Sequence, residues 1–241
     1  LRPSELLIPE HLSAIAEQIK CGAIRQRPDW DFDLDGAHLF LNQHFKTQTL
    51  ASFGCDKLDC ALAAAGCLLQ YLKETQQSEL SHITSIKVEN IDSSVLVDAT
   101  TRRNLELEIN LTGGRENTLL SVMDNTATPM GSRMLARWLN RPLQDRREIS
   151  RRHNVIDNII TSRKYDDISK TLKGVGDLER ILARIGLRSC RPRDLARLRE
   201  GLSQLPKLQT ILGEINSNAV TEIARDISTF PDVEHLLTRA I

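Results

Sequence analysis

The stretch Thr126-Ala-Thr-Pro-Met-Gly-Ser-Arg-Met-Leu-Ala-Arg-Trp-Leu139 carries clear helix signals. Pro129 suits the first turn of a helix, because the N–H that proline lacks would have no partner there in any case. Apolar residues then recur every three or four positions and form one stripe, made of Met130, Met134, Leu135, Trp138 and Leu139. Pro142 ends the pattern, so the stretch predicts an amphipathic helix that packs along one side.

Helix signals continue from this stretch to the C-terminus, and we expect further helices over residues 145–161, 177–188, 193–204 and 220–228. The breaks in the pattern contain glycine or proline, at Gly174-Val-Gly176, Pro192, Pro206 and Pro231. Before Ala99 the chain mixes strand-like and helical segments. The expected fold class is therefore mostly α, with a partial α/β piece over residues 1–79 followed by an all-helical piece over residues 80–241.

Strand signals are confined to the residues before Ala99. Residues 5–8 predict a short strand, with a helix after it to about Lys20. The sequence Asp29-Trp-Asp-Phe-Asp-Leu-Asp35 alternates acidic and apolar residues, and this period of two predicts a half-buried strand. An Ala- and Leu-rich run predicts a helix over residues 58–75, and two short β segments are expected over residues 83–88 and 94–97.

The charge of the chain is zero overall but unevenly distributed. The 241 residues include 32 basic and 32 acidic side chains. Residues 1–101 carry a net charge of −6, residues 102–199 carry +9, and residues 200–241 carry −3. A neutral total argues against a general polyanion-binding protein, whereas the basic middle region keeps phosphate contact open. No apolar run reaches the ~18 residues that a membrane span needs, and no signal peptide is visible, so membrane and secreted classes are not expected.

Catalytic and metal-binding motifs are missing from the sequence. It contains no GxxxxGK[ST] phosphate loop, no HExxH pair and no GxSxG elbow. Asp31-Phe-Asp-Leu-Asp-Gly36 resembles half of a calcium loop, but Asn42 stands where the pattern requires glutamate. We therefore expect a chain that is not an enzyme and binds no metal or cofactor itself. Cys55, Cys60 and Cys67 are expected to be inert core thiols, which fits a cytoplasmic location.

Arginines recur at helical spacing in the basic region. Arg133, Arg137 and Arg141 follow one another every four residues, and Arg180, Arg184 and Arg188 repeat the spacing. Two interpretations remain open. The arginines can contact a DNA backbone, for which Arg133, Arg137, Arg141, Arg180 and Arg184 are the candidates. Alternatively their stems lie along amphipathic helices and their charges pair one turn away, as expected for Asp177 with Arg180, Glu148 with Arg152 and Asp194 with Arg197.

Several segments resemble, in order, the MutS family of DNA mismatch-repair proteins. The segment Asp98-Ala-Thr-Thr-Arg-Arg-Asn104 resembles the start of the family's core domain, and residues 118–139 resemble its most distinctive stretch. Asp177-Leu-Glu-Arg-Ile-Leu-Ala-Arg184 and Arg191-Pro-Arg-Asp-Leu-Ala-Arg197 follow. Upstream, Phe53-Gly54 and residues 64–71 resemble the closing helices of the connector domain. The signature residues are expected to be structural: Asp98, Arg102, Arg103, Asn104, Gly131, Arg133, Trp138 and Leu139.

Three of these residues have physical reasons for their identity. Asp98 precedes a helix and is a plausible N-cap. Gly131 lies in the first turn of its helix, where a missing Cβ permits close approach by another backbone. Trp138 is the largest apolar side chain in its stripe.

The resemblance implies a function for a longer parent protein. Such a parent binds mismatched duplex DNA as a homodimer, uses ATP with Mg²⁺, and recruits MutL. This chain lacks the family's Phe-x-Glu wedge and its phosphate loop, so it resembles a fragment that covers the second half of the connector and the first part of the core and lever domain. We expect a structural and allosteric module, monomeric or weakly self-associating, in a cytoplasmic, nucleoid-associated bacterial protein. Direct DNA-backbone contact by residues 102–199, or MutL docking on residues 1–79, are the alternatives.

Overall fold

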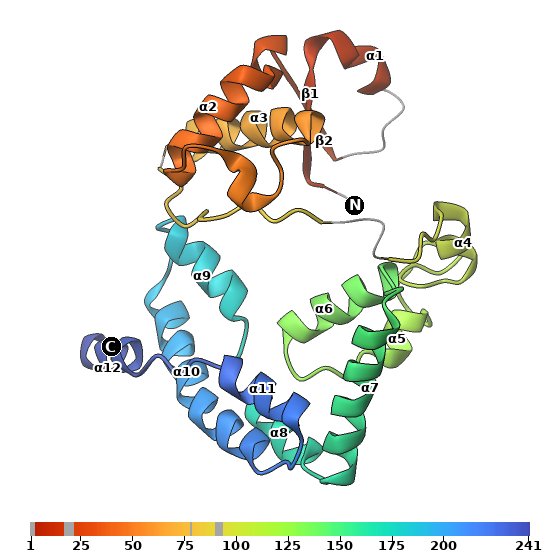
Figure 1. Cartoon of the computed structure of the whole chain (residues 1–241), viewed down its shortest axis with the longest axis vertical. Helices are drawn as coiled ribbons and strands as arrows, with labels where there is room; N and C mark the ends of the chain where they lie inside the picture. Colours follow the sequence, from red (N-terminus) through yellow and green to blue (C-terminus); the bar gives the residue numbers. More distant parts are fainter. Residues whose placement is uncertain (1–2, 17–21, 78, 90–93) are drawn as a thin grey trace. The chain divides into compact units, whose positions relative to one another are not determined.

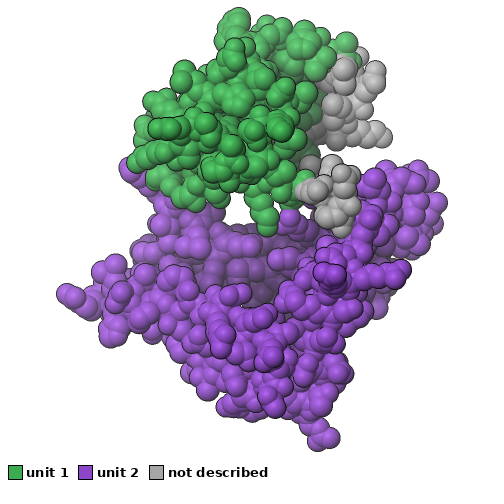
Figure 2. Space-filling view, in the orientation of Figure 1, with its two compact units in different colours: residues 1–89 green, residues 90–241 purple. Residues whose placement is uncertain are grey.

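The computed structural model describes residues 3–16, 22–77, 79–89 and 94–241. The chain divides into two compact units, residues 1–89 and residues 90–241, shown in different colours in Figure 2. Figure 1 labels the helices and strands of both. Helices predominate and the strands are few and short, which confirms the predicted fold class.

Unit 1 (residues 1–89) joins a two-stranded parallel sheet to two longer helices. Strand β1 (Glu5–Pro9) pairs with β2 (Ala23–Arg27) in the register Glu5 to Ala23, and the predicted strand at residues 5–8 is confirmed. A 3-10 turn, η1 (Glu10–Leu12), and a short helix, α1 (Ser13–Ala16), follow β1. The predicted helix extended to Lys20, and residues 17–21 lie outside the described part of the chain.

Helices α2 (Leu34–Phe45) and α3 (Asp59–Gln76) enclose the core of unit 1, with the short turn η3 (Leu50–Phe53) between them. The predicted helix over residues 58–75 is confirmed as α3. The buried cluster consists of Leu41, Leu50, Cys55, Leu62, Leu69 and Leu80. Cys55 and Cys67 are buried, and burial raises the pKa of the Cys67 thiol; Cys60, in the first turn of α3, is exposed, so the expectation of a core thiol was wrong there.

The acidic stretch at residues 29–35 is not a strand, and the prediction from its period of two was wrong. Residues Asp29–Phe32 form a 3-10 turn, η2, and α2 begins two residues later. The Asp33 carboxylate accepts a hydrogen bond from the Gly36 backbone N–H at 2.8 Å and caps α2. Asp31 is buried against Arg27 at 2.7 Å, while Trp30 is 76% exposed. Local capping and an ion pair therefore decided this segment, since aspartate favours helix N-termini over strands.

The two expected β segments after α3 are also absent from the described residues. Residues 83–88 have no regular structure, and the His44 ring, through Nε2, lies 2.9 Å from the Ile83 carbonyl oxygen. Ser94 forms a single antiparallel bridge with Leu143. The first segment thus contacts α2, and the second contacts the connection between α6 and α7, so neither meets a regular strand that could continue a ladder.

Unit 2 (residues 90–241) is helical throughout its described part. Its helices are α4 (Ala99–Asn104), α5 (Leu119–Met123), α6 (Pro129–Asn140), α7 (Arg146–Thr161), α8 (Tyr165–Lys173), α9 (Leu178–Gly186), α10 (Pro192–Gly213), α11 (Asn218–Asp226) and α12 (Pro231–Ala240). The expected helices near residues 129–141, 145–161, 177–188 and 220–228 are confirmed within a few residues. Helices α8 and α12 were not predicted.

Helix α10 forms the spine of unit 2 and packs against two separate hydrophobic clusters. Leu198 and Leu202 in its first half join Ile181 of α9 and Leu237 of α12. Leu208 and Leu212 in its second half join Ile215, Val220 and Ala224, with side chains of α7 and α8 packed around them. The helix was predicted to end near residue 204, but Pro206 lies inside it. Apolar packing on both sides of the proline holds the helix together despite the lost backbone hydrogen bond.

Candidate functional site: the Arg133 junction between α6 and α9

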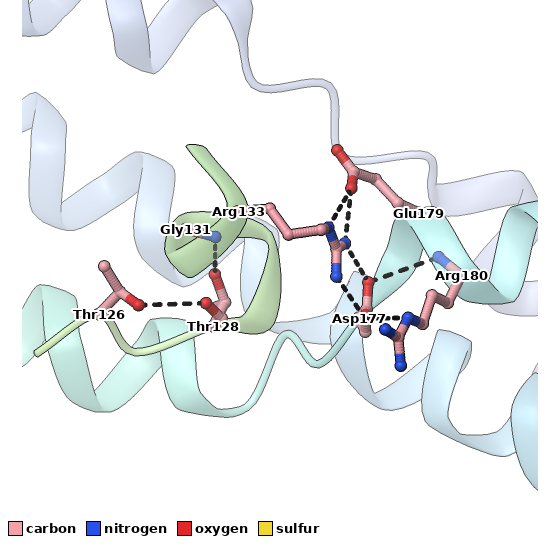
Figure 3. Close-up of polar contacts among 7 residues, drawn as sticks. All are labelled: Thr126, Thr128, Gly131, Arg133, Asp177, Glu179 and Arg180. Atoms are coloured by element: carbon pink, nitrogen blue, oxygen red, sulfur yellow. Dashed lines mark hydrogen bonds and ion pairs between the residues drawn. The ribbon is translucent and has the colours of Figure 1, made fainter. Parts of the chain in front are cut away.

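The start of α6 is a tightly hydrogen-bonded turn. The Thr128 hydroxyl accepts a hydrogen bond from the Gly131 backbone N–H at 3.0 Å and caps the helix, and Pro129 occupies its first turn (Figure 3). Asp124 accepts hydrogen bonds from the Thr126 backbone N–H and from the hydroxyls of Thr126 and Ser132. The Ser132 hydroxyl is the first cause that lowers the pKa of Asp124. This network fixes the direction in which α6 leaves the turn.

Arg133 projects from the first part of α6 and binds two acidic residues at the start of α9 (Figure 3). Its Nη1 and Nη2 donate to the two carboxylate oxygens of Asp177 at 3.0 and 2.7 Å. Its Nε and Nη2 donate to Oε2 of Glu179 at 3.1 and 2.6 Å. We call these three side chains the Arg133 junction. The planar guanidinium fork is suited to this bidentate contact, and lysine could not reproduce it.

The charges of the Arg133 junction stabilise one another. The Arg133 guanidinium, through its hydrogen bonds, is the first cause that holds the pKa of Asp177 below its ordinary value. The hydrogen bonds that Arg133 donates to Asp177 and Glu179 raise the pKa of Arg133 in turn. The side chains of Arg133 and Glu179 are 39% and 66% exposed, whereas that of Asp177 is 17% exposed. Asp177 is therefore the least exposed member of the junction, and solvent screens its outer part.

Asp177 is held in place by its own segment. Its carboxylate accepts a hydrogen bond from the Arg180 backbone N–H at 3.4 Å and caps α9, a role that the sequence analysis did not predict. The expected pair with Arg180 is present, with Arg180 Nε 3.5 Å from the carboxylate. The linker before it lies directly on α10, because Val175 is 3% exposed and a Cβ added to Gly201 would overlap the Val175 carbonyl oxygen. Gly201 thus permits the close approach that positions Asp177.

A second ion pair fastens the far end of α9 to the start of α10. Arg184 Nη1 donates to Asp194 at 2.6 Å, and Asp194 also accepts from the Arg191 backbone N–H at 3.1 Å. That backbone hydrogen bond is the first cause that lowers the pKa of Asp194, and the charge of Arg184 adds to it. The prediction of an Asp194–Arg197 pair was wrong: Asp194 turns back to cap its helix and faces α9.

Trp138 is part of a polar contact between α6 and α7. Its side chain is 44% exposed, and the Arg152 guanidinium lies 4.0 Å from the centre of its ring. Arg152 Nε also donates to Glu148 at 3.0 Å, which confirms the expected Glu148–Arg152 pair. The Trp138 ring therefore takes part in a cation–π interaction, and the sequence contained no specific signal for this partner. Leu139, next to it, is half-buried.

The Asp98 segment is joined to the end of α6. Asp98 accepts hydrogen bonds from the Thr101 backbone N–H at 2.6 Å and from the Thr101 hydroxyl at 3.1 Å, so the predicted N-cap is confirmed. Arg102 donates to the Val97 carbonyl at 2.9 Å and to the Asn140 carbonyl at 3.1 Å. Sequence reasoning missed Asn140, whose importance depends on the folded arrangement. The other two signature residues of α4, Arg103 and Asn104, are exposed.

The candidate DNA-contact arginines fall into two groups. Arg133, Arg180 and Arg184 each lie within an ion pair of unit 2. Arg137 and Arg141 follow on α6 and at its C-terminal cap, and both are exposed. The structure therefore places Arg133, Arg180 and Arg184 against acidic partners on α9 and α10. Contact between any of the five and DNA stays a prediction.

The described residues contain no group of three or more His, Cys, Asp or Glu side chains arranged to hold a metal ion. In the same part of the chain, no helix is both long enough and apolar enough to span a membrane.

Comparison with protein families accounts for most of the chain. Residues 1–84 match MutS domain II, and residues 100–241 match MutS domain III. The residues of the Arg133 junction, the Asp98 segment from residue 100 onward and the spine helix α10 all fall within the domain III match. Since the domain III match alone covers more than half of the sequence, the chain belongs to the MutS family.

Proposed function

We propose that this chain serves as a structural and allosteric module in DNA mismatch repair, joining the DNA-binding parts of a longer MutS-family protein to its ATPase domain. The observation that carries the proposal is the Arg133 junction, which binds α6 to α9 through two carboxylates, one of them at the N-cap of α9. Energetic coupling between distant sites needs a contiguous set of packed elements, and unit 2 supplies one.

The path from α6 to α9 and α10 is continuous. Arg152 of α7 lies on Trp138 of α6, and Val155 and Ile159 of α7 pack against the cluster around Leu208. Ile181 of α9 packs in the other cluster of α10. A displacement at one end of this series must therefore be accommodated by neighbouring helices, which is what an allosteric linker requires.

ATP and Mg²⁺, which the resemblance implies for the parent protein, do not fit the residues of this chain. The sequence has no GxxxxGK[ST] loop to surround a triphosphate. The described residues also offer no carboxylate cluster for a divalent ion. We therefore propose that the chain by itself is not an enzyme, and that ATP turnover belongs to another domain of the parent.

The partners in this proposal are those of the longer protein. Mismatched duplex DNA, MutL and a second copy of the parent would contact it largely through other domains. The chain alone is proposed to be a monomer or to associate weakly, in a cytoplasmic, nucleoid-associated bacterial protein. Docking of MutL on residues 1–79 is a separate proposal, and a pull-down of MutL by the chain tests it.

A domain replacement tests the module directly. Residues 1–241 would replace domains II and III in a full-length MutS-family ATPase, and ATP turnover would be measured with matched and with mismatched duplex. We expect the mismatch to change turnover in the chimera as it does in the host. A folded chimera with normal basal turnover but no response to the mismatch would contradict the proposal, as would ATP hydrolysis by the isolated chain.

The second candidate function is direct contact with a DNA backbone, favoured by the net charge of +9 over residues 102–199. Fluorescence anisotropy with labelled duplex, at about 50 and about 200 mM salt, tests it. Tight binding that weakens steeply with salt supports the contact, because each neutralised phosphate releases counterions. The exposed pair Arg137→Gln and Arg141→Gln should then weaken binding, while Arg151→Gln on α7 is the matched charge control. No binding at the lower salt removes this candidate.

A further inference from the structure

The helices of unit 2 form two packed bodies that share α10. The first body contains α9, α12 and the first half of α10, packed around Leu198 and Leu202. The second contains α7, α8, α11 and the second half of α10, packed around Leu208 and Leu212. The two clusters have no residue in common. Pro206 lies between Leu202 and Leu208, at the division between them.

At the boundary between the two bodies, the backbone of α10 lacks one helical hydrogen bond. Pro206 has no N–H, so the hydrogen bond to the Leu202 carbonyl is missing from α10. The Thr210 hydroxyl donates to the Pro206 carbonyl at 3.0 Å, a side-chain contact that often accompanies bending of a helix. A proline with such a back-bond is one of the few identifiable causes of a helix bend. Helix α10 can therefore flex at this point without breaking either cluster.

The other connections between the bodies lie beside the same part of α10. The linker from α8 to α9 contains Gly174 and Gly176, and Gly176 has a φ of 74°. A Cβ on Gly174 would lie 2.9 Å from the Gln204 side chain, so this linker runs along α10 next to Pro206. The Gln209 amide donates to the Ile227 carbonyl at 3.3 Å, just before the linker from α11 to α12. All three crossings thus lie close to residues 204–209 of α10.

The Arg133 junction adds a side-chain connection between the bodies beside the linker from α8 to α9, because Asp177 directly follows Gly176. Arg133 stands on α6, which meets the second body where Arg152 of α7 covers Trp138. Its partners Asp177 and Glu179 stand at the start of α9, in the first body. In Figure 1 the helices α7, α8 and α10 lie between α6 and α9 along the ribbon of unit 2. The ion pairs of Arg133 with Asp177 and Glu179 connect α6 directly to the start of α9. The Arg133 junction is polar and partly exposed, so its ion pairs can break without exposing a hydrophobic core.

We infer that α10 is hinged at Pro206, and that the Arg133 junction is a latch that holds the two bodies of unit 2 in one arrangement. With the latch closed, α6 and α9 are fixed by the guanidinium of Arg133. When competing anions or salt displace the carboxylates, the first body swings about residues 204–209 while both clusters stay packed. This two-state element is the physical device that a lever needs.

Electron–electron distance measurements on the 241-residue chain test the latch. Spin labels attached to p-acetylphenylalanine would replace Ala183 on α9 and Asn154 on α7, two exposed positions in different bodies. At low salt the distribution of distances between the two labels should be narrow in the wild type. Arg133→Gln should broaden this distribution severalfold or add a second distance, and Arg133→Lys should give a width between those of the wild type and Arg133→Gln. Arg151→Gln, which removes the same charge from a pair within one helix, should leave it narrow.

The same distance measurement also tests the hinge. Adding Pro206→Ala to Arg133→Gln restores the missing backbone donor and should narrow the distribution again. Raising the NaCl concentration should broaden the distance distribution of the wild type, and this condition tests the latch without any substitution in it. A distribution for Arg133→Gln equal to that of Arg151→Gln, together with a wild type that does not respond to salt, overturns the latch. Broadening that Pro206→Ala leaves unchanged overturns the hinge.

Discussion

At the scale of single residues, Gly131 occupies a position where an added carbon would be in tight contact with its neighbours. A Cβ there would lie 3.2 Å from Thr126 Cβ and 3.3 Å from Thr128 Oγ1, and both threonines are held by hydrogen bonds of the turn. Gly131→Ala should therefore lower the free energy of unfolding by about 1 kcal/mol, because overpacking outweighs the better helix propensity of alanine. Thermal or urea unfolding measures the change.

Gly213 provides the matched control for that substitution. It also lies at a helix terminus, and nothing stands within 4 Å of the Cβ position. Gly213→Ala should leave stability unchanged or raise it by up to about 1 kcal/mol. If both variants gain stability, the close contact at Gly131 does not restrict the turn.

Glu148 should make stability depend on pH in the acid range. Hydrogen bonds from Arg151 and then from Arg152 lower its pKa from an ordinary 4.5 to about 2. A carboxyl whose folded pKa is depressed stabilises the fold above its unfolded pKa, and that contribution is lost as pH falls through the folded pKa. Glu148→Gln should thus lower the unfolding midpoint at neutral pH, and the difference from wild type should shrink between about pH 4.5 and about pH 2.

The two arginines supply the control for the pH experiment. In a background of Arg151→Gln with Arg152→Gln, the effect of Glu148→Gln should be much smaller and should lose this pH dependence. A difference that persists unchanged down to about pH 2 in the wild-type background would show that another interaction of Glu148 is responsible.

At the scale of helices, the contact between α10 and the linker before α9 depends on Gly201. A Cβ on Gly201 would overlap the backbone carbonyl oxygen of Val175, which cannot move as a flexible side chain can. We expect Gly201→Ala to cost about 3 kcal/mol and to displace Asp177 from Arg133. Urea unfolding measures the first effect, with Gly213→Ala in the same helix as control. A change below about 0.5 kcal/mol would contradict the close packing.

Elements with explicit local signals could be predicted from the sequence. Thr128, Pro129 and Pro142 define α6 because caps and prolines act through the backbone of their own segment. The stretch at residues 29–35 misled because its alternation imitates a strand, while Asp33 supplied a cap that the pattern did not count. Pro206 led to the opposite error, because it predicted the end of a helix. Apolar contacts on both sides of the proline instead keep α10 helical through it.

The whole molecule contains separate cores in its two units, and substitutions in one core should remain local. A Cβ on Gly66 in α3 would lie 2.5 Å from Ala37 Cβ in α2, so Gly66→Ala disrupts the main helix contact of unit 1. We expect faster hydrogen exchange in peptides from α2 and α3 and unchanged exchange in peptides from α10. Gly201→Ala is the reciprocal variant. Equal acceleration in α3 and α10 for either variant would contradict independent cores.

The candidate site was only partly visible before folding. Gly131, Arg133 and Asp177 stand in segments that resemble the family, and the N-cap at Asp98 was predicted from its position before a helix. The pairing of Arg133 with Asp177 and Glu179 joins residues 44 and 46 positions apart. No helical periodicity extends over such separations, so a local pattern could suggest only neighbours one turn away, as for Asp194, whose real partner is Arg184.

The sequence by itself determined the helical class of the chain, most of its helix boundaries, its charge partition and its family resemblance. These depend on backbone caps, apolar period and residue order, all of which act over a few positions. Only the tertiary structure decided that α10 continues through Pro206 between two clusters, that Arg152 covers Trp138, and that Arg133 reaches α9. The physical reason is the distance along the sequence between the residues in contact. These contacts form only when distant segments pack together, and the packing energies then override local preferences.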